Sequence, residues 1–314
     1  MNHAKTAANI ATVLIVAMMV GMSELLREPE IIFPEITALA IGALAAPRLV
    51  WKTSRLRMVL LIAVSAIGGV FLVKWVPLPL WGKMVLAFFL CQILYAYSGT
   101  TFAPLISAMV LPVLLGTTSW VYPVAAVVLT LLIIAIRRLF ERAGVREWEP
   151  FVPAPRPSRQ DLLYGAGRVA CMAVFTGIAL AIDARFCIAP PLLVAFTEFT
   201  GPECAARRMP VRVVSFISLC AAGGALCRWG LTMQLGLPLT VSAVAAAGIL
   251  LLLVPIFGLY IPPAGAMAIL PMLIPVEAVL FYPIQVLAGS AVWMLLACLL
   301  FPIRCIGARH RQPE

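Results

Sequence analysis

Two proline-rich stretches contain the residues whose types and spacing most clearly allow binding chemistry. Pro262, Pro263, Ala264 and Gly265 lie in YIPPAGAMAILPMLIP (260–275), and Pro104 lies in its partner TFAPLISAMVLPVLLG (101–116). Proline suits the first turn of a helix, and small residues there expose backbone N–H groups. The positive end of the helix dipole then favours a small anion. The alternative is that proline and glycine only permit close helix packing.

A second stretch, at 188–212, places Thr197, Glu198 and Thr200 inside an apolar run. An ionisable group within a membrane segment is costly and is therefore a functional candidate. Glu198 fits a proton-coupling carboxylate, or a charge that repels anions and sets selectivity. The alternative pairs it with a nearby cation, Arg207 or Arg208.

Two further groups of polar residues complete the candidate site. Glu35 lies close to the end of its segment, as does Glu277, which makes both weaker candidates than Glu198. None of the three acids has an acidic counterpart in the other half of the chain, so a site built on them is asymmetric. Hydroxyl groups extend an anion site or equally cap helices. The remaining candidates are Glu35, Thr37, Ser98, Thr100 and Thr101.

Several classes of chemistry are disfavoured by the residues themselves. The histidines are His3 and His310, both at the ends of the chain, and the eight cysteines include no C-x-x-C pair. We therefore expect no metal and no cofactor, and the chain has no convincing nucleophile and base set for an intramembrane enzyme. The net charge of +10 comes from residues that flank apolar segments, so nucleic acid is not an expected partner.

The composition, 63% apolar and 11% charged, predicts an all-α polytopic membrane protein in the lipid bilayer. Spanning the bilayer takes about 20 apolar residues. The second and fifth segments of each half, 31–47, 102–117, 186–202 and 261–275, are shorter and contain proline. They are tilted spans, broken helices or re-entrant hairpins. The other apolar segments are 8–26, 58–74, 80–97, 119–136, 163–183, 211–228, 237–258 and 278–302.

Most basic residues cluster in alternate loops, which the positive-inside rule places in the cytoplasm together with both termini. The short polar leader favours a bacterial inner membrane. The predicted organisation is a first membrane repeat (1–136), a cytoplasmic linker rich in proline and arginine (137–160), a second membrane repeat (161–303) and a cytoplasmic tail (304–314).

An internal duplication is indicated by matches at nearly constant offsets. An offset of 155 pairs Pro47 with Pro202, Arg57 with Arg212, and Gly69 with Gly224. Offsets of 159 and 160 pair Gly99 with Gly258, Pro104 with Pro263, and Tyr122 with Tyr282. Because the matched basic loops share a side, the chain is expected to hold two tandem parallel repeats of six segments with short proline-broken helices.

The stretches IPPAGAMAIL and APPLLVAFTEFTGPECAARRMPVRVV resemble the HPP family of integral membrane proteins. The family motif is His-Pro-Pro followed by small residues; here Ile261 stands at the histidine, and Pro262 to Ala266 match. The resemblance implies a doubled HPP-like protein. Plant and cyanobacterial members are associated with nitrite transport, which implies a small monovalent anion as substrate. Loss of this titratable donor is consistent with a different substrate or a different coupling ion.

These observations together predict a transporter or channel for a small, nitrite-like anion, with its site between the repeats at the amino ends of the broken helices. One alternative is an exporter of organic acids or hydrophobic solutes, which needs a wide apolar cavity. Another is a non-transporting membrane scaffold subunit, which needs tightly packed repeats. A homo-oligomer is a common arrangement for such proteins.

Overall fold

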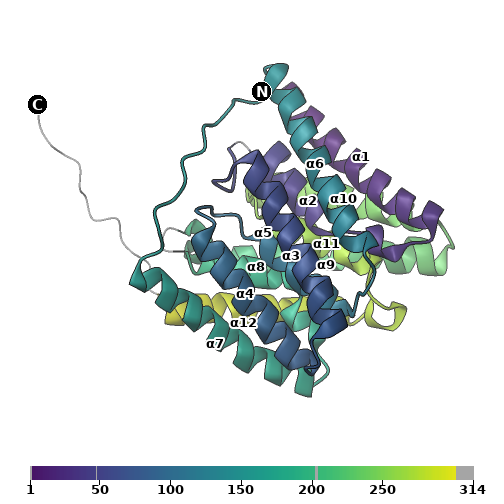
Figure 1. Ribbon diagram of the computed structural model, residues 1–314. Helices are drawn as coiled ribbons and strands as arrows, with labels where there is room; N and C mark the ends of the chain where they lie inside the picture. Colours follow the sequence, from purple (N-terminus) through teal and green to yellow (C-terminus); the bar gives the residue numbers. More distant parts are fainter. Residues whose placement is uncertain (1, 47, 202–203, 302–314) are drawn as a thin grey trace, which may run out of the picture.

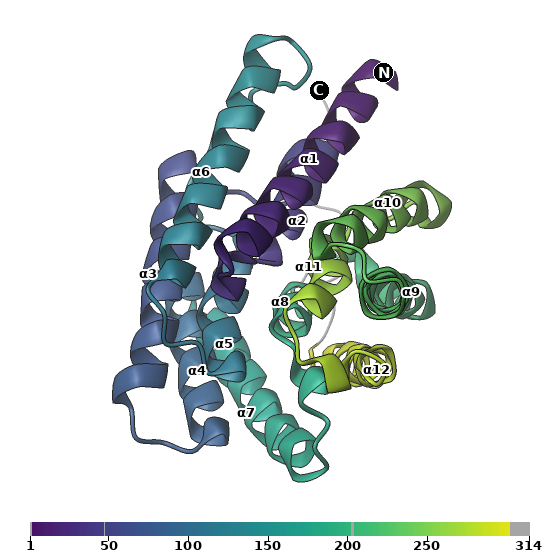
Figure 2. The same cartoon turned by 90° about the vertical axis from the view of Figure 1, so that its right-hand side faces the viewer.

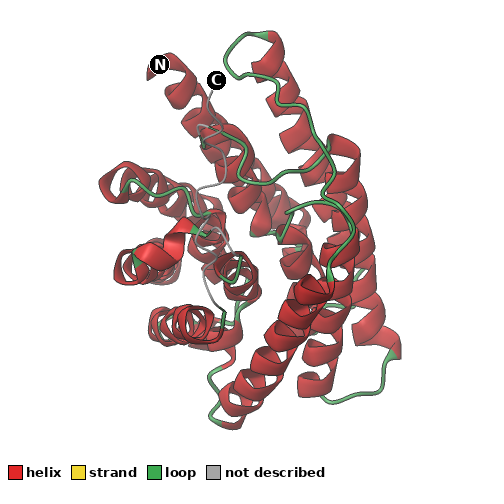
Figure 3. Ribbon diagram, turned by 90° about the vertical axis from the view of Figure 1, so that its left-hand side faces the viewer, coloured by secondary structure: helices red, strands yellow, loops and turns green. Residues whose placement is uncertain are grey.

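The computed structural model describes residues 2–46, 48–201 and 204–301, and in those ranges it is built of helices and loops without a strand (Figures 1 and 3). The all-α prediction is confirmed, and every predicted apolar segment contains one α-helix. Pro47, Pro202 and the predicted cytoplasmic tail lie outside the described residues.

Eight helices of the described chain are long and apolar enough to cross a membrane. They leave large apolar side chains on their outer surfaces, such as Leu25 (76% exposed), Val211 (78%) and Leu299 (72%). Such surfaces suit lipid and not water, so the fold is that of a multi-pass membrane protein. These helices are α1 (Asn2–Leu26), α3 (Arg55–Trp75), α4 (Leu80–Tyr97), α6 (Val121–Arg142), α7 (Arg159–Ala181), α9 (Pro210–Cys227), α10 (Leu239–Phe257) and α12 (Tyr282–Leu300).

Four shorter α-helices occupy the middle of the described molecule (Figure 2). With 6 to 12 residues each, they reach at most about 18 Å at 1.5 Å per residue, against a hydrocarbon core of about 30 Å. None of them crosses a bilayer alone. They are α2 (Glu35–Ala40), which continues as the π-helical turn η2 (Ile41–Ala45), α5 (Pro104–Leu115), α8 (Pro190–Phe199) and α11 (Pro262–Ile269).

The four short helices form a closed ring. Helix α2 packs against α11 and α5, and α8 packs against the same two helices. Nearly every residue of the four is buried. A helix that ends inside the membrane leaves backbone groups unpaired, and these are tolerated only where protein surrounds them. The ring is therefore the core that the long helices enclose.

The long helices surround this ring in two groups (Figure 2). Helices α3 and α6 lie on one side of the ring, and α9, α10 and α12 lie on the other. In that view α9 and α12 are seen end-on, whereas α1 and α6 are seen along their length, so the two groups cross. Two long pairs join the halves of the chain, because α1 packs against α10 and α4 packs against α7.

Tyrosines at the starts of α6 and α12 hold the short helices in the same way. The hydroxyl group of Tyr122 donates to the carbonyl oxygen of Ala108 in α5 (3.0 Å), and that of Tyr282 donates to the carbonyl oxygen of Met267 in α11 (2.8 Å). Both tyrosines are buried, so each hydroxyl group needs this partner.

Glycines in α3 and α9 allow close approach to the same two short helices. A Cβ atom on Gly69 would lie 2.3 Å from the carbonyl oxygen of Met109, and one on Gly224 would lie 2.0 Å from that of Ala268. No side chain fits at either position. Glycine therefore sets the distance between each long helix and its short neighbour.

Two predicted boundaries shift. Helix α1 begins at Asn2, so the described part of the polar leader is helical, and α6 continues to Arg142, which leaves residues 143–158 as the connecting loop. This loop folds back on the first half of the chain and runs along it in Figure 3. The amide of Ala154 donates to the carbonyl oxygen of Gly99 (2.9 Å), and Glu149 accepts from the amide of Leu49 (3.2 Å). The remaining short turns are η1 (Pro29–Ile31), η3 (Arg185–Ile188), η4 (Ala205–Arg208), η5 (Arg228–Gln234), η6 (Leu270–Met272) and η7 (Val276–Ala278).

Candidate functional site

The amino-terminal residues of the four short helices meet around a small cavity at the centre of the ring, which we call the central cavity. Its volume is about 10 Å³, close to the room that one water molecule needs. The wall has little polar surface, because prolines begin three of the helices. The lining residues are Glu35, Ala38, Trp51, Pro104, Pro191, Val194, Pro262, Pro263 and Ala266.

Glu35 is the one carboxylate in this wall, at the first position of α2. Its side chain is 1% exposed; Oε1 accepts a hydrogen bond from the hydroxyl group of Ser107, and Oε2 has no partner. The nearby hydroxyl of Thr37 is also buried without a partner. No described cation forms an ion pair with Glu35. Its place near the end of a segment made Glu35 a weak candidate, yet it is the most buried of the three predicted acids, Glu35, Glu198 and Glu277.

The amino end of α11 offers fewer donors than its sequence predicted. Pro262 and Pro263 have no N–H group, and the amide of Ala264 donates to the carbonyl oxygen of Ile261 (3.0 Å). A Cβ atom on Gly265 would lie 3.2 Å from the backbone of Thr37 in α2. Close helix packing, the alternative explanation of this motif, therefore accounts for Gly265.

Glu198, in α8, makes a contact that the sequence did not predict. Its Oε1 accepts a hydrogen bond from the indole Nε1 of Trp51 (2.8 Å), a residue of the loop between η2 and α3. The alternative pairing with Arg207 or Arg208 is wrong, because neither forms an ion pair with Glu198 in the described structure. Arg207 instead donates to backbone carbonyl groups, and Arg208 is exposed.

Arginines satisfy the carboxyl ends of three of the short helices. Carbonyl groups at a helix end lack partners and carry the negative end of the dipole, so a guanidinium stabilises them. At the end of η2, the guanidinium of Arg146 donates to the carbonyl oxygen of Ala45 (3.0 Å). Burial and the nearby charge of Arg137 lower the pKa of this guanidinium. The contacts to carbonyl oxygens are Arg137 to Ala43 (2.6 Å), Arg207 to Gly201 (2.6 Å) and Arg228 to Ile274 (2.6 Å).

The predicted threonines Thr197, in α8, and Thr200, directly after it, belong to a buried polar cluster around Arg168. The guanidinium of Arg168, in α7, donates to Thr200 Oγ1 (2.6 Å) and to Gln92 Oε1 (3.1 Å), and Gln92 donates to Thr197 Oγ1 (3.2 Å). Sequence reasoning missed Arg168 and Gln92. The signal was present, since Arg168 is an ionisable residue inside an apolar segment and meets the same criterion as Glu198.

A larger depression, which we call the outer hollow, opens beside the central cavity. Its volume is about 680 Å³, and its wall includes Arg48, Trp51, Lys52, Thr100 and Thr101. The predicted hydroxyl groups here are largely engaged locally. Thr101 Oγ1 accepts from the amide of Lys52 (2.8 Å), and Ser98 and Thr100 bond to each other (2.8 Å), so their capping role is supported.

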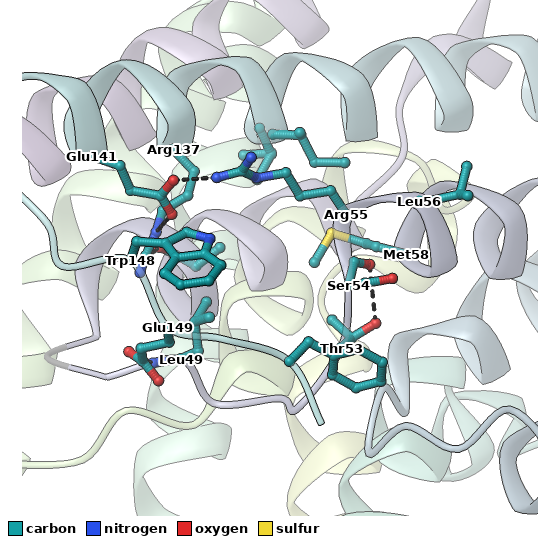
Figure 4. Close-up of a pocket in the computed structure, with 14 residues that line it drawn as sticks. Leu49, Thr53, Ser54, Arg55, Leu56, Met58, Arg137, Glu141, Trp148 and Glu149 are labelled. Carbon is teal, nitrogen blue, oxygen red and sulfur yellow. Dashed lines mark hydrogen bonds and ion pairs between the residues drawn. The ribbon is translucent and has the colours of Figure 1, made fainter. Parts of the chain in front are cut away.

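A neighbouring depression of about 340 Å³ lies between α3, α6 and the connecting loop (Figure 4). Its two arginines, Arg55 and Arg137, both pair with Glu141, and Glu149 is a second carboxylate in its wall. Trp148 also lines it. With both arginines engaged by Glu141 and two carboxylates in its wall, it is a poorer candidate for anion binding than the outer hollow.

No group of three or more metal-ligating side chains gathers within the described ranges. No model of a known protein family matches the chain, and no curated protein or solved structure matches it either. The geometry of the short helices and their carboxylates is therefore what indicates a function.

Proposed function

We propose that the protein is a transporter or channel for a small monovalent anion such as nitrite in a bacterial inner membrane. One observation carries the proposal: the carboxyl group of Glu35, with an unpartnered oxygen and no ion pair, lies where the amino ends of four short helices meet. Helix amino ends stabilise negative charge. This centre therefore favours one negative charge, which is either the carboxylate of Glu35 or a bound substrate anion.

The arrangement also gives a reason for coupling to protons. While Glu35 is ionised, its charge fills the positive field of the helix ends and repels a second anion. Once Glu35 takes up a proton, a substrate anion can replace that charge. The cavity holds about 10 Å³, so the substrate enters only when the short helices separate. Binding of proton and anion would then be linked.

We further propose that the chain is a tandem duplication with parallel repeats and both termini in the cytoplasm. The matched tyrosine and glycine contacts of the two halves support the duplication. Gly99 and Gly258 support it as well, because both have left-handed backbones (φ 63° and 60°) and lie beside Arg57 and Arg212. Membership of the HPP family stays a prediction from the sequence motif.

A non-transporting scaffold subunit is the second candidate function, and a specific observation favours it. The ring of short helices is tightly packed, with a central cavity near the size of one water molecule. An exporter of organic acids or hydrophobic solutes is less favoured, because it needs a wide apolar cavity between the short helices, whereas the cavity where they meet holds about 10 Å³.

The test is uptake of nitrite into proteoliposomes that contain the purified protein, with and without a pH gradient. The wild-type protein is compared with Glu35→Gln and Glu198→Gln, and with Glu277→Gln as the matched control, since Glu277 lies in the exposed turn η7. We expect saturable uptake driven by the gradient, a loss of gradient dependence in Glu35→Gln, and unchanged uptake in Glu277→Gln.

Each outcome has a definite consequence. No uptake above empty vesicles rejects nitrite transport and favours the scaffold function. Uptake that ignores the gradient in the wild-type protein supports a channel and removes the coupling role of Glu35. Equal loss in all three variants would indicate damage to the fold and not to the site.

A further inference from the structure

Trp51 lies between the outer hollow and the central cavity. It lines both spaces, and no other described residue does. Its side chain is 2% exposed, although it belongs to a loop. A solute that moved from the outer hollow to Glu35 by the shortest route would therefore have to displace this indole ring.

Three contacts hold the indole ring in place. Glu198, from the other half of the chain, accepts its N–H group (2.8 Å). Phe102 packs edge-on against it, with ring centroids 5.4 Å apart. Gly42 makes room for it, because a Cβ atom there would lie 2.4 Å from the ring. The ring thus fills a fitted space and is fixed by a polar bond to a different segment.

We infer that Trp51 is the barrier between the outer hollow and the central cavity, and that Glu198 is the positioning residue that holds the barrier closed. The inference rests on the proposed transport function for its meaning, since the barrier would control access to Glu35. Its geometry is independent of the substrate. Glu198 acts through the indole N–H bond, so its loss should matter only while Trp51 is present.

The test measures access to the central cavity without measuring transport. Val194, 3% exposed, lines that cavity, and Val194→Cys reports its accessibility to a water-soluble thiol reagent, read at that residue by mass spectrometry. Thr53→Cys in the outer hollow is the accessible reference, and the native thiol of Cys91, 0% exposed, is the buried reference. Labelling is compared with Trp51 present and in Trp51→Ala.

We expect Val194→Cys to react slowly beside Trp51 and at least about tenfold faster in Trp51→Ala, because the reaction no longer waits for a local opening. Trp293→Ala is the matched control, since Trp293 is an equally buried tryptophan that donates to the carbonyl oxygen of Cys187 and lines neither space. It should leave the rate unchanged. If Trp51→Ala does not fold, Trp51→Phe, which keeps a ring but loses the N–H donor, should give a smaller increase.

The role of Glu198 is tested by the same readout. Glu198→Leu should raise the labelling rate of Val194→Cys. Glu198→Gln should keep that rate close to the one with Glu198, because its amide oxygen still accepts from the indole N–H group. In a protein that already carries Trp51→Ala, Glu198→Leu should cause no further increase. Two results would overturn the inference. One is that Val194→Cys is labelled as fast as Thr53→Cys while Trp51 is present. The other is that Trp51→Ala does not raise the labelling rate of Val194→Cys. A faster rate in Trp51→Ala in a protein that moves no nitrite upholds the barrier and rejects nitrite transport instead.

Discussion

The buried charge of Arg168 is stabilised by hydrogen bonds to neighbouring polar side chains. Its side chain is 8% exposed, and the groups that accept its hydrogen bonds, Gln92 and Thr200, are neutral. A buried cation is costly unless its donors are satisfied. The cluster therefore joins α4, α7 and α8 through hydrogen bonds to a charged group, which are stronger than those between neutral groups.

Replacing Arg168 by Met should destabilise the protein by about 1.5–3 kcal/mol, because Thr200 and Gln92 stay buried and lose their donor. The measurement is the midpoint of thermal unfolding in detergent, with Arg208→Met, an exposed arginine of η4, as control. Adding Gln92→Leu should recover part of the loss, since one stranded acceptor is removed. An unchanged midpoint for Arg168→Met would contradict the structural role of this cluster.

At the scale of elements, the short helices depend on how closely the long helices approach them. The contact of α3 with α5 requires Gly69, because an added methyl group would overlap the carbonyl oxygen of Met109. Such overlaps force the backbone apart. A substitution of this kind acts on the separation of two helices and so on every contact along both of them.

We expect Gly69→Ala to cost about 1–3 kcal/mol through overpacking, even though alanine has the higher helix propensity. Gly165→Ala in α7 is the matched control, since nothing lies within 4 Å of its added methyl group. That control should be neutral or more stable by about 0.5–1 kcal/mol. Thermal unfolding in detergent compares the two, and equal stabilities would show that α3 and α5 can separate freely.

The sequence predicted which segments form helices better than it predicted how deeply each residue is buried in the molecule. Length and proline content identified all four short segments, because both properties are local. The position of Glu35 was not predictable in this way. A residue at the end of an apolar segment lies near the membrane surface only if that segment crosses the membrane, whereas α2 begins at the centre of the molecule. The contact of Glu198 with Trp51 joins residues from different halves, and no local pattern encodes it.

At the scale of the whole molecule, the first helix of each half packs against the other half. The carboxylate of Glu24, in α1, accepts from the amide of Thr240 at the start of α10 (2.8 Å), and the indole of Trp81, in α4, donates to the carbonyl oxygen of Ala173 in α7 (2.8 Å). Neither half therefore contains all the partners of its own helices.

Splitting the chain within the connecting loop, into residues 1–150 and 151–314, should give fragments that are stable only together. Each fragment expressed alone is expected to be degraded or to aggregate, because α1 or α7 lacks its partner helix. Co-expression should yield a complex that co-purifies through a tag on one fragment. A monodisperse fragment purified alone would contradict the interdependence of the halves.

The pairing of α1 with α10 also imposes an order in time. Helix α1 ends at Leu26 and α10 begins at Leu239, so most of the polypeptide must be made between the two. At a synthesis rate of about 5–20 residues per second, this interval is on the order of tens of seconds. During it α1 can already pack against α2, η1 and η2 of its own half, but the face that contacts α10 has only lipid or the insertion machinery as a neighbour. Helix α1 is thus made long before the helix that completes its packing, and it reaches its final environment only after α10 has been inserted.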